Sequence, residues 1–340
     1  MSTLPAEGWP IIGHRATVDL LRHSINAKRV SHAYLLHGPP AVGKFALSRA
    51  FAQALNCTAE AAPCGQCRAC QLIAAEKHPD VRVIQMPADK REIPIDLIRV
   101  IQHEAALKPY EAIWKVYIIR DAENMSEEAA NCLLKTLEEP PPQVILVLTA
   151  PTPEALLPTI VSRCQPLAMH PVPISDIEQA LAEGHACDAQ SAHLLARLSA
   201  GRIGWAIAAS RDQSVLEARQ HLMDQLQGLT HASRVDRLAF AAEHGQRYTK
   251  GVAERETVHA MLATWSTWWR DLLLIANGCS DRIVNVDRVD TLRSEARRLG
   301  LQPVRAFLDA LSLADLRLRQ NVNPRLALEV LALAIPSGSH

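Results

Sequence analysis

The sequence has no excess charge of either sign and few aromatic residues. Among its 340 residues, Lys and Arg together number 36, Asp and Glu together also number 36, and aromatic residues make up 4%. A balanced charge creates no overall electrostatic field that would attract nucleic acid or a membrane surface. We therefore expect any contact with DNA to be local or shared with partner chains.

Long apolar segments are lacking as well. We find no uninterrupted apolar run long enough to cross a bilayer, and no positively charged segment followed by an apolar one at the N-terminus. The expected location is therefore cytoplasmic. Apolar residues make up 48% of a chain that is too long for one ordinary core, so two or three packed domains are expected.

The eight cysteines are spread unevenly. Four of them crowd into the spacing C-x6-C-x2-C-x2-C, at Cys57, Cys64, Cys67 and Cys70. Four thiolates with no open position are typical of a closed structural Zn²⁺ site, which ties down a loop that has little core of its own. Free or redox-active thiols, or an iron–sulfur cluster, are the alternatives. The scattered cysteines, expected to be buried apolar fillers, are Cys132, Cys164, Cys187 and Cys279.

A phosphate-binding loop is indicated between a short apolar strand and an Ala/Leu-rich helix. Gly38, Gly43 and Lys44 fall at the fixed positions of a Gly-x4-Gly-Lys motif, which turns backbone N–H groups and a helix N-terminus toward phosphate oxygens. The next position normally supplies a Ser or Thr hydroxyl to Mg²⁺, but here it is Phe45. The pattern fits a degenerate nucleotide site, and a chance match remains the alternative.

Hydrophobic patterning predicts an α/β region followed by a helical one. Predicted strands cover 35–36, 78–84, 114–119 and 144–148, and predicted helices cover 18–27, 46–55, 94–106 and 126–139. The run at 114–119 is continuously apolar, as expected of a central parallel strand. From about Ala168 onward only helices are expected. Within them, Trp265, Trp268 and Trp269 share one helix face, which favours core or subunit packing over base stacking.

Several strings together resemble one known family. They are the Asn-Cys-Leu-Leu-Lys-Thr-Leu-Glu-Glu-Pro-Pro string at 131–141, Ser-Arg-Cys at 162–164, His-Ala-Tyr-Leu-Leu at 32–36, the four cysteines behind the phosphate loop, and the segment 321–329. In this combination the chain resembles the bacterial replicative clamp loaders of the AAA+ class, strongly over about residues 8–170. The resemblance implies an α/β AAA+ P-loop domain with a zinc-binding insertion, followed by a helical lid and a helical collar.

The resemblance also suggests which kind of member this is. In the family's ATPase subunits, gamma/tau, an Asp that holds Mg²⁺ and a catalytic Glu stand eleven and ten positions before the Asn of the shared string. The corresponding residues here are Arg120 and Asp121. With Phe45 as well, both protein ligands to Mg²⁺ are missing, so we expect no Mg²⁺ site, weak or absent ATP or ADP binding, and almost no hydrolysis. The arginine that ATPase subunits carry in the lid is not evident in the run 201–206.

Arg163 is the residue to which the resemblance assigns a catalytic contribution. It implies that Arg163 acts in trans as an arginine finger toward ATP on a neighbouring gamma/tau subunit. A surface arginine in a turn is the plainer interpretation. The implied partners are gamma/tau and delta subunits in a hetero-oligomeric ring, with the sliding clamp and primed DNA met through that complex. The chain would then be an accessory subunit of a DNA-directed DNA polymerase, a nucleotidyltransferase holoenzyme used in DNA replication.

The domain boundaries follow from this assignment. We expect the AAA+ domain at 1–167 with its zinc module at about 57–70, the lid at 168–210, the collar at 211–335 and a tail at 336–340. Two other functions stay open: an active ATPase of the same family, and a zinc-dependent DNA-binding module with a vestigial P-loop. The balanced net charge argues against the latter. A basic run is more typical of a solvated face than of a DNA track: Arg293, Arg297, Arg298 and Arg305.

Overall fold

A computed structural model describes residues 8–336 except 88, 89, 91, 185, 186, 213 and 321. The predicted tail beyond Pro336 and the first residue of the segment 321–329 therefore lie outside the described residues. The chain divides into two compact units, Met1–Cys187 with Ser199–Ala208, and Asp188–Leu198 with Ala209–His340. The finer division into AAA+ domain, lid and collar stays a prediction.

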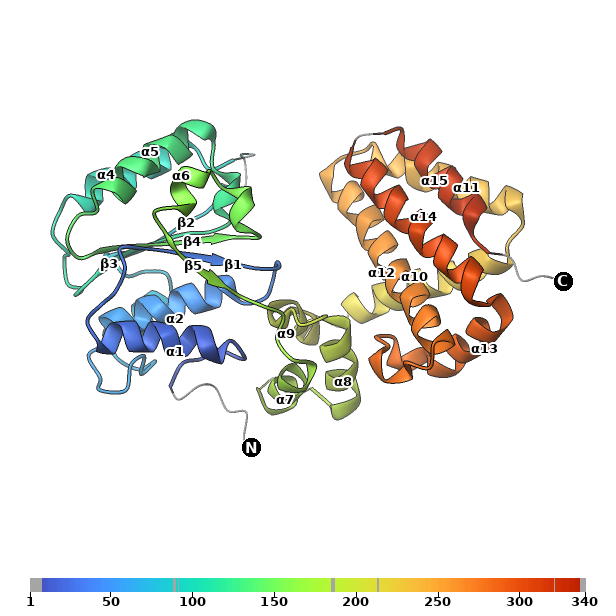
Figure 1. Cartoon of the computed structure of the whole chain (residues 1–340), viewed down its shortest axis with the longest axis horizontal. Helices are drawn as coiled ribbons and strands as arrows, with labels where there is room; N and C mark the ends of the chain where they lie inside the picture. The colour runs from blue at the N-terminus through green and yellow to red at the C-terminus, as the bar shows by residue number, and fades with distance from the viewer. Residues whose placement is uncertain are drawn as a thin grey trace. The chain divides into compact units, whose positions relative to one another are not determined.

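The first unit is built on a parallel five-stranded sheet (Figure 1). In the order β2-β3-β4-β1-β5, its strands are Val81–Ile84, Lys115–Ile119, Val144–Ala150, Ala33–His37 and Gln165–Ala168. Every residue of β3 and β4 is buried, as the continuous apolar runs predicted. Because all strands run the same way, their carboxyl ends meet at one edge, where loops from β1, β3 and β4 come together.

Helices cover both faces of this sheet. α1 (Arg15–Asn26) and α2 (Lys44–Asn56) lie on one face, and α4 (Ile95–Ala105) and α5 (Glu127–Glu138) lie on the other (Figure 1). Successive residues of β1, β3 and β4 point alternately into two apolar clusters, one filled by α1 and α2 and the other by α4 and α5. The predicted α/β architecture, with a phosphate loop between its first strand and the next helix, is confirmed.

The strand β5 was not predicted from the sequence. It has only four residues, one of which is Pro166, and only Leu167 is fully buried. Proline lacks the N–H donor of a sheet ladder and is tolerated on an edge strand, which is the place of β5 beside β1. Short helices that were also not predicted are α3 (Arg68–Ala74) and α6 (Pro158–Val161).

The segment between α4 and β3 is held by a buried carboxylate. Asp80 precedes β2, and its two oxygens accept hydrogen bonds from the backbone N–H groups of Tyr110, Glu111 and Ala112, at 2.8, 2.9 and 3.0 Å. Burial raises the pKa of Asp80, but the three donors together outweigh burial, so the pKa lies below its ordinary value. The charged carboxylate thus fixes how the chain enters β3.

Beyond the sheet the described chain is helical. The first unit continues with α7 (Ile174–Gly184) and the start of α9 (Ile203–Arg211), and α8 (Ala189–Leu198) belongs to the second unit. The long helices of the second unit are α10 (Ser214–His231), α11 (Arg234–Tyr248), α12 (Val252–Ala276), α13 (Val289–Leu299), α14 (Leu301–Arg319) and α15 (Pro324–Ala334).

Three tryptophans of α12 form the centre of the second unit. Trp265 and Trp268 are each 2% exposed and Trp269 is fully buried, and its ring centroid lies 4.6 Å from that of Phe307 in α14. The indole N–H of Trp265 donates to the carbonyl oxygen of Leu222 at 3.3 Å. Rings that are this deeply buried cannot stack on bases, so the prediction of packing is confirmed.

Candidate nucleotide and metal sites

The predicted phosphate loop joins β1 to α2 and needs glycine at two positions. Gly38 has a φ of 154°, and a Cβ atom there would collide with the carbonyl oxygen of Met169. Gly43 has a φ of 111° and directly precedes α2. Both backbone conformations favour glycine, so the two glycines of the motif give the loop the turn that the sequence pattern predicted.

Lys44 is directed back onto the loop. Its ammonium group donates to the carbonyl oxygens of Gly38 at 2.6 Å and Pro39 at 3.0 Å. Burial lowers the pKa of Lys44, and the nearby carboxylates of Asp121 and Glu123 counteract that effect. The lysine that a working loop would offer to a phosphate is thus satisfied by the chain's own backbone.

A pocket of about 530 Å³ lies beside this loop at the carboxyl edge of the sheet. The pocket is lined by residues from the phosphate loop, from the ends of β3 and β4, and from α9. The lining residues are Pro40, Ala41, Gly43, Lys44, Phe45, Ala46, Arg120, Asp121, Glu123, Thr149, Pro151 and Gly204. The structure therefore brings together the predicted Gly43, Lys44, Phe45, Arg120 and Asp121, although they come from segments 75 residues apart.

Phe45 and Arg120 contact each other in this pocket. The guanidinium carbon of Arg120 lies 4.4 Å from the centroid of the Phe45 ring, and its Nη1 donates to Oε1 of Gln85 at 2.9 Å. The guanidinium carbon of Arg49 lies 5.7 Å from the same ring. At the two positions to which the family resemblance assigns Mg²⁺ ligands, the side chains form a cation–π pair. A phenyl ring and a guanidinium offer no oxygen ligand to Mg²⁺.

The acidic residues of the pocket are Asp121 and Glu123. The backbone N–H of Asp121 donates to the hydroxyl of Thr149 at 2.9 Å, which fixes the turn after β3. Burial raises the pKa of Glu123, and Asp121 raises it further. Glu123 and Thr149 were not singled out from the sequence. Glu123 could have been found as an acidic residue two positions after Asp121, close to the end of the predicted strand. No local sequence pattern indicates Thr149.

The start of α9 contacts the phosphate loop through a hydrogen bond between backbone groups. The N–H of Gly204 donates to the carbonyl oxygen of Ala41 at 2.8 Å, and a Cβ on Gly204 would lie 2.9 Å from that same oxygen. Arg202, two residues before Gly204, donates through Nε to the carbonyl oxygen of Ser199 at 2.8 Å. It is not among the residues that line the pocket.

The four clustered cysteines form a compact set of sulfur ligands. The Sγ atoms of Cys57, Cys64, Cys67 and Cys70 all lie within 4.8 Å of one another. A tetrahedron with metal–sulfur bonds of 2.3 Å has sulfurs about 3.8 Å apart. The Cys57 and Cys67 sulfurs lie 4.0 Å apart. The cluster could therefore hold a metal ion, and the donor set fits zinc.

Hydrogen bonding and burial shift the pKa values of these thiols in opposite directions. Hydrogen bonds to the Cys67 sulfur, the largest from the backbone N–H of Cys70, outweigh burial and lower the pKa of Cys67 to about 6. Burial raises the pKa of Cys70 to about 12. A metal would have to displace the proton of Cys70. Gln53 of α2 donates to the carbonyl oxygen of Cys70 at 2.8 Å, which fastens the cluster to the sheet-covering helix.

Arg163 lies outside this pocket, in the turn between α6 and β5. Its Nη2 donates to Oε1 of Glu138 at 2.7 Å, and its Nη1 donates to the carbonyl oxygen of Thr159 at 2.9 Å. The Arg163 side chain is 35% exposed, whereas the neighbouring Cys164 is buried. The structure thus presents the guanidinium at the surface of the first unit, and the predicted finger role stays a prediction.

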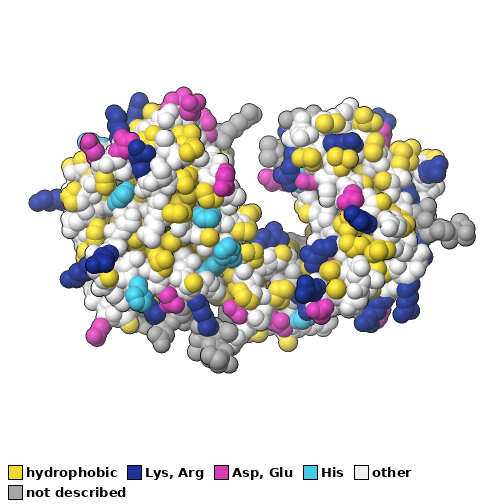
Figure 2. Space-filling view, viewed as in Figure 1, with side chains coloured by type: hydrophobic (Ala, Val, Ile, Leu, Met, Phe, Trp, Pro, Cys, Tyr) yellow, Lys and Arg dark blue, Asp and Glu magenta, His cyan; other side chains and the backbone are white. Residues whose placement is uncertain are grey.

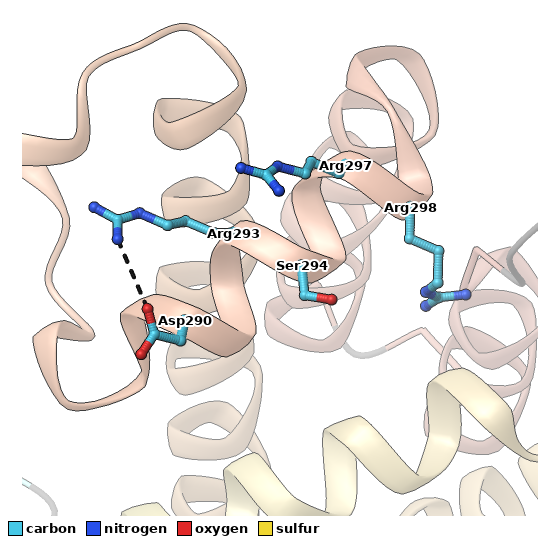
Figure 3. Close-up of a pocket in the computed structure, with 5 residues that line it drawn as sticks. All are labelled: Asp290, Arg293, Ser294, Arg297 and Arg298. Carbon is cyan, nitrogen blue, oxygen red and sulfur yellow. Dashed lines mark ion pairs between the residues drawn. The ribbon is translucent and has the colours of Figure 1, made fainter.

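Three arginines of the basic run, Arg293, Arg297 and Arg298, belong to α13, and Arg305 belongs to α14. Figure 3 shows Arg298 directed away from Arg293 and Arg297. Arg298 pairs with Glu295 at 2.6 Å, and Arg293 approaches Asp290 at 3.7 Å. On the face seen in Figure 2, basic and acidic side chains are interspersed. Acidic neighbours therefore offset Arg293 and Arg298, as is common on a solvated face, and the interpretation of the whole run as a solvated face stays a prediction.

Within the part of the chain that the structure describes, no helix is both long and apolar enough for a bilayer crossing.

Known proteins that are similar in sequence to this chain include subunits of DNA polymerase III. A family described as "DNA polymerase III, delta subunit" matches residues 13–173. The DNA polymerase III subunit delta′ of Bacillus subtilis is 32% identical over 322 residues, which are 94% of this chain and 95% of that protein. The delta′ subunit of Pseudomonas aeruginosa is 43% identical over 136 residues, 39% of this chain and 42% of that one.

A solved structure of a DNA polymerase III gamma subunit-related protein from Thermotoga maritima is also similar. It has 19% sequence identity and a TM-score of 0.41, over 93% of this chain and 98% of that one.

Proposed function

This chain belongs to the delta′ family of DNA polymerase III subunits, and on that premise we propose that it is a non-hydrolysing subunit of the clamp loader. In this proposal its own phosphate loop does not turn over ATP. Its contribution to catalysis is Arg163, which it presents to ATP bound on a neighbouring gamma/tau subunit. It also helps hold the ring in the form that places a sliding clamp on primed DNA.

The observation that carries the proposal is the contact between Phe45 and Arg120. At the two positions where a hydrolysing loop holds Mg²⁺, this chain has an aromatic ring and a guanidinium 4.4 Å apart. Without the metal, the charge that develops on a transferring phosphoryl group lacks its main source of neutralisation. Gly38, Gly43 and Lys44 keep the shape of a phosphate cradle, so weak nucleotide binding without turnover is compatible with the site.

The position of Arg163 supports a role outside its own pocket. A guanidinium that is permanently charged and partly exposed can reach a phosphate on another chain, and it offers a planar fork that suits such an oxyanion. In other phosphoryl-transfer systems an arginine supplied in trans raises the rate by about 10³ to 10⁵.

The four-cysteine cluster is proposed to hold one structural zinc ion. Cys57, Cys64, Cys67 and Cys70 leave no open position for substrate, so the metal would stabilise the segment between α2 and α3 rather than act in catalysis. The proposed partners are gamma/tau and delta subunits, and the sliding clamp and primed DNA through the complex. As part of a polymerase holoenzyme the chain would act in the cytoplasm.

The test uses a ring reconstituted with gamma/tau and delta subunits. Arg163→Ala should lower DNA-stimulated ATP turnover, because the site that Arg163 faces should lose about 10³-fold or more in rate while the other sites continue. Arg99→Ala is the matched control, since Arg99 is an exposed arginine of the same unit that pairs with Asp96 at 3.4 Å. Equal turnover of the Arg163→Ala and wild-type rings would remove the finger assignment.

The isolated chain discriminates between the remaining functions. Turnover above background that Lys44→Ala abolishes would identify an active ATPase. Salt-sensitive binding of duplex DNA by the chain alone, lost on zinc chelation, would identify a DNA-binding module.

A further inference from the structure

We propose that Glu138 is a positioning residue for Arg163, holding the guanidinium in the orientation from which it reaches a neighbour's phosphate. This inference rests on the proposed function and adds to it a second residue. The two side chains are 25 positions apart in sequence and are joined by the 2.7 Å contact between Nη2 and Oε1. Glu138 is the last residue of α5, and Arg163 follows α6, so the pair links two separate elements.

The hydrogen bonds of Arg163 define its orientation and leave part of it available. Nη1 donates to the carbonyl oxygen of Thr159 at 2.9 Å and is 3.4 Å from the hydroxyl of Ser162, while Nη2 donates to Glu138. A guanidinium has five N–H donors. Among the described residues, Nε and the second N–H of Nη2 have no protein acceptor. The fork is therefore fixed on one side and still able to bind an oxyanion on the other.

The placement of Glu138 does not serve the helix that carries it. A helix carries partial negative charge at its C-terminus, so a carboxylate in the last turn is electrostatically unfavourable. Glu138 nevertheless occupies the last position of α5. The positive charge of the Arg163 guanidinium compensates for this unfavourable interaction, so the carboxylate is tolerated at the end of α5.

The pair does not serve overall stability either. The Glu138 side chain is 50% exposed, and ion pairs between exposed side chains contribute little to the free energy of unfolding. What the contact provides is restriction of a long side chain that otherwise samples many rotamers. An arginine held before the neighbouring site forms is ready for the transition state, and displacement of a reacting group by about 1 Å can reduce a rate by about a hundredfold.

Glu138→Gln in the reconstituted ring tests this role, because the amide keeps the shape of the side chain and removes its charge. We expect the kcat of DNA-stimulated ATP turnover at the site facing Arg163 to fall on the order of fivefold, with KM for ATP unchanged. Glu139→Gln is the matched control, since Glu139 is adjacent and exposed. Its ring should behave like wild type. Glu138→Asp keeps the charge on a shorter side chain. The kcat of its ring should lie between those of the wild-type and Glu138→Gln rings.

The double variant separates positioning from other effects. If Glu138 acts through Arg163, a ring with both Arg163→Ala and Glu138→Gln should have the same ATP turnover as a ring with Arg163→Ala alone. Unchanged or raised turnover for Glu138→Gln, or a further loss in the double variant, would overturn the positioning role. These outcomes differ from failure of the proposed function itself, in which Arg163→Ala would have no effect on the ring.

Discussion

Replacing the Phe45–Arg120 pair with metal ligands is the perturbation that follows most closely from the pocket. Phe45→Thr alone supplies a hydroxyl but leaves the Arg120 guanidinium where a cation would bind. Arg120→Asp alone supplies a carboxylate but leaves the Phe45 ring. We therefore expect Mg²⁺ to strengthen nucleotide binding only in the double variant, because only that variant both provides two oxygen ligands and removes the competing positive charge.

The effect on folding should be small. Phe45 and Arg120 are half-buried and lie at 4.4 Å, a distance at which a cation–π contact contributes about 0.5 to 2 kcal/mol. Each single variant should lose about that amount in free energy of unfolding, and the double variant should lose less than the sum of the two, because both singles remove the same contact. Urea unfolding of the four proteins measures this coupling.

Isothermal titration with ATP, with and without Mg²⁺, measures the ligand effect. Only the double variant should bind ATP more tightly with Mg²⁺ than without it. An Mg²⁺-dependent increase in affinity already present in the wild-type chain would refute the reasoning, because it would mean that Asp121, Glu123 or water holds the metal despite Arg120.

Three further perturbations have defined outcomes. Asp80→Asn should lose about 1 to 3 kcal/mol of stability at pH 7. In the wild type the Asp80 contribution should be complete above the unfolded pKa of about 3.9 and be lost as the pH falls through the lower folded pKa, which acid unfolding of both proteins would show. Metal analysis should find about one zinc per chain, and Cys70→Ser should lower both zinc content and thermal stability; a metal-free chain of unchanged stability would contradict the four-thiolate site. Trp269→Ala should lose about 3 to 5 kcal/mol, measured by chemical unfolding, because the ring is fully buried against Phe307, whereas a loss below 1 kcal/mol would argue against a tightly packed centre of the second unit.

The sheet and its covering helices could be predicted from the sequence because their signals are local. The apolar run before Arg120 forms β3 with every residue buried, and the run at 144–148 lies within β4. β5 could not be predicted in this way, since Pro166 and its exposed neighbours give no strand pattern and the segment is a strand only because it pairs with β1. The strand predicted at 78–84 begins later, at Val81, because the preceding backbone turns to place Asp80 under the loop at 110–112.

The sites show the same division between local and tertiary information. Four closely spaced cysteines indicated a metal cluster, and glycine spacing indicated a phosphate loop. The sequence also marked Phe45 and Arg120 as departures from a hydrolysing pattern. Their contact with each other depends on how β1 and β3 are spaced by β4 in the sheet, which no local signal encodes. The same holds for Glu138 and Arg163, whose contact needs α5 and α6 to be packed.

One comparison tests the central claim most directly: DNA-stimulated ATP turnover of the reconstituted ring carrying either Lys44→Ala or Arg163→Ala in this chain. If the chain assists a neighbour's reaction without one of its own, Lys44→Ala should leave turnover at the wild-type level and Arg163→Ala should lower it. The reverse pattern, with turnover sensitive to Lys44 and indifferent to Arg163, would contradict the account.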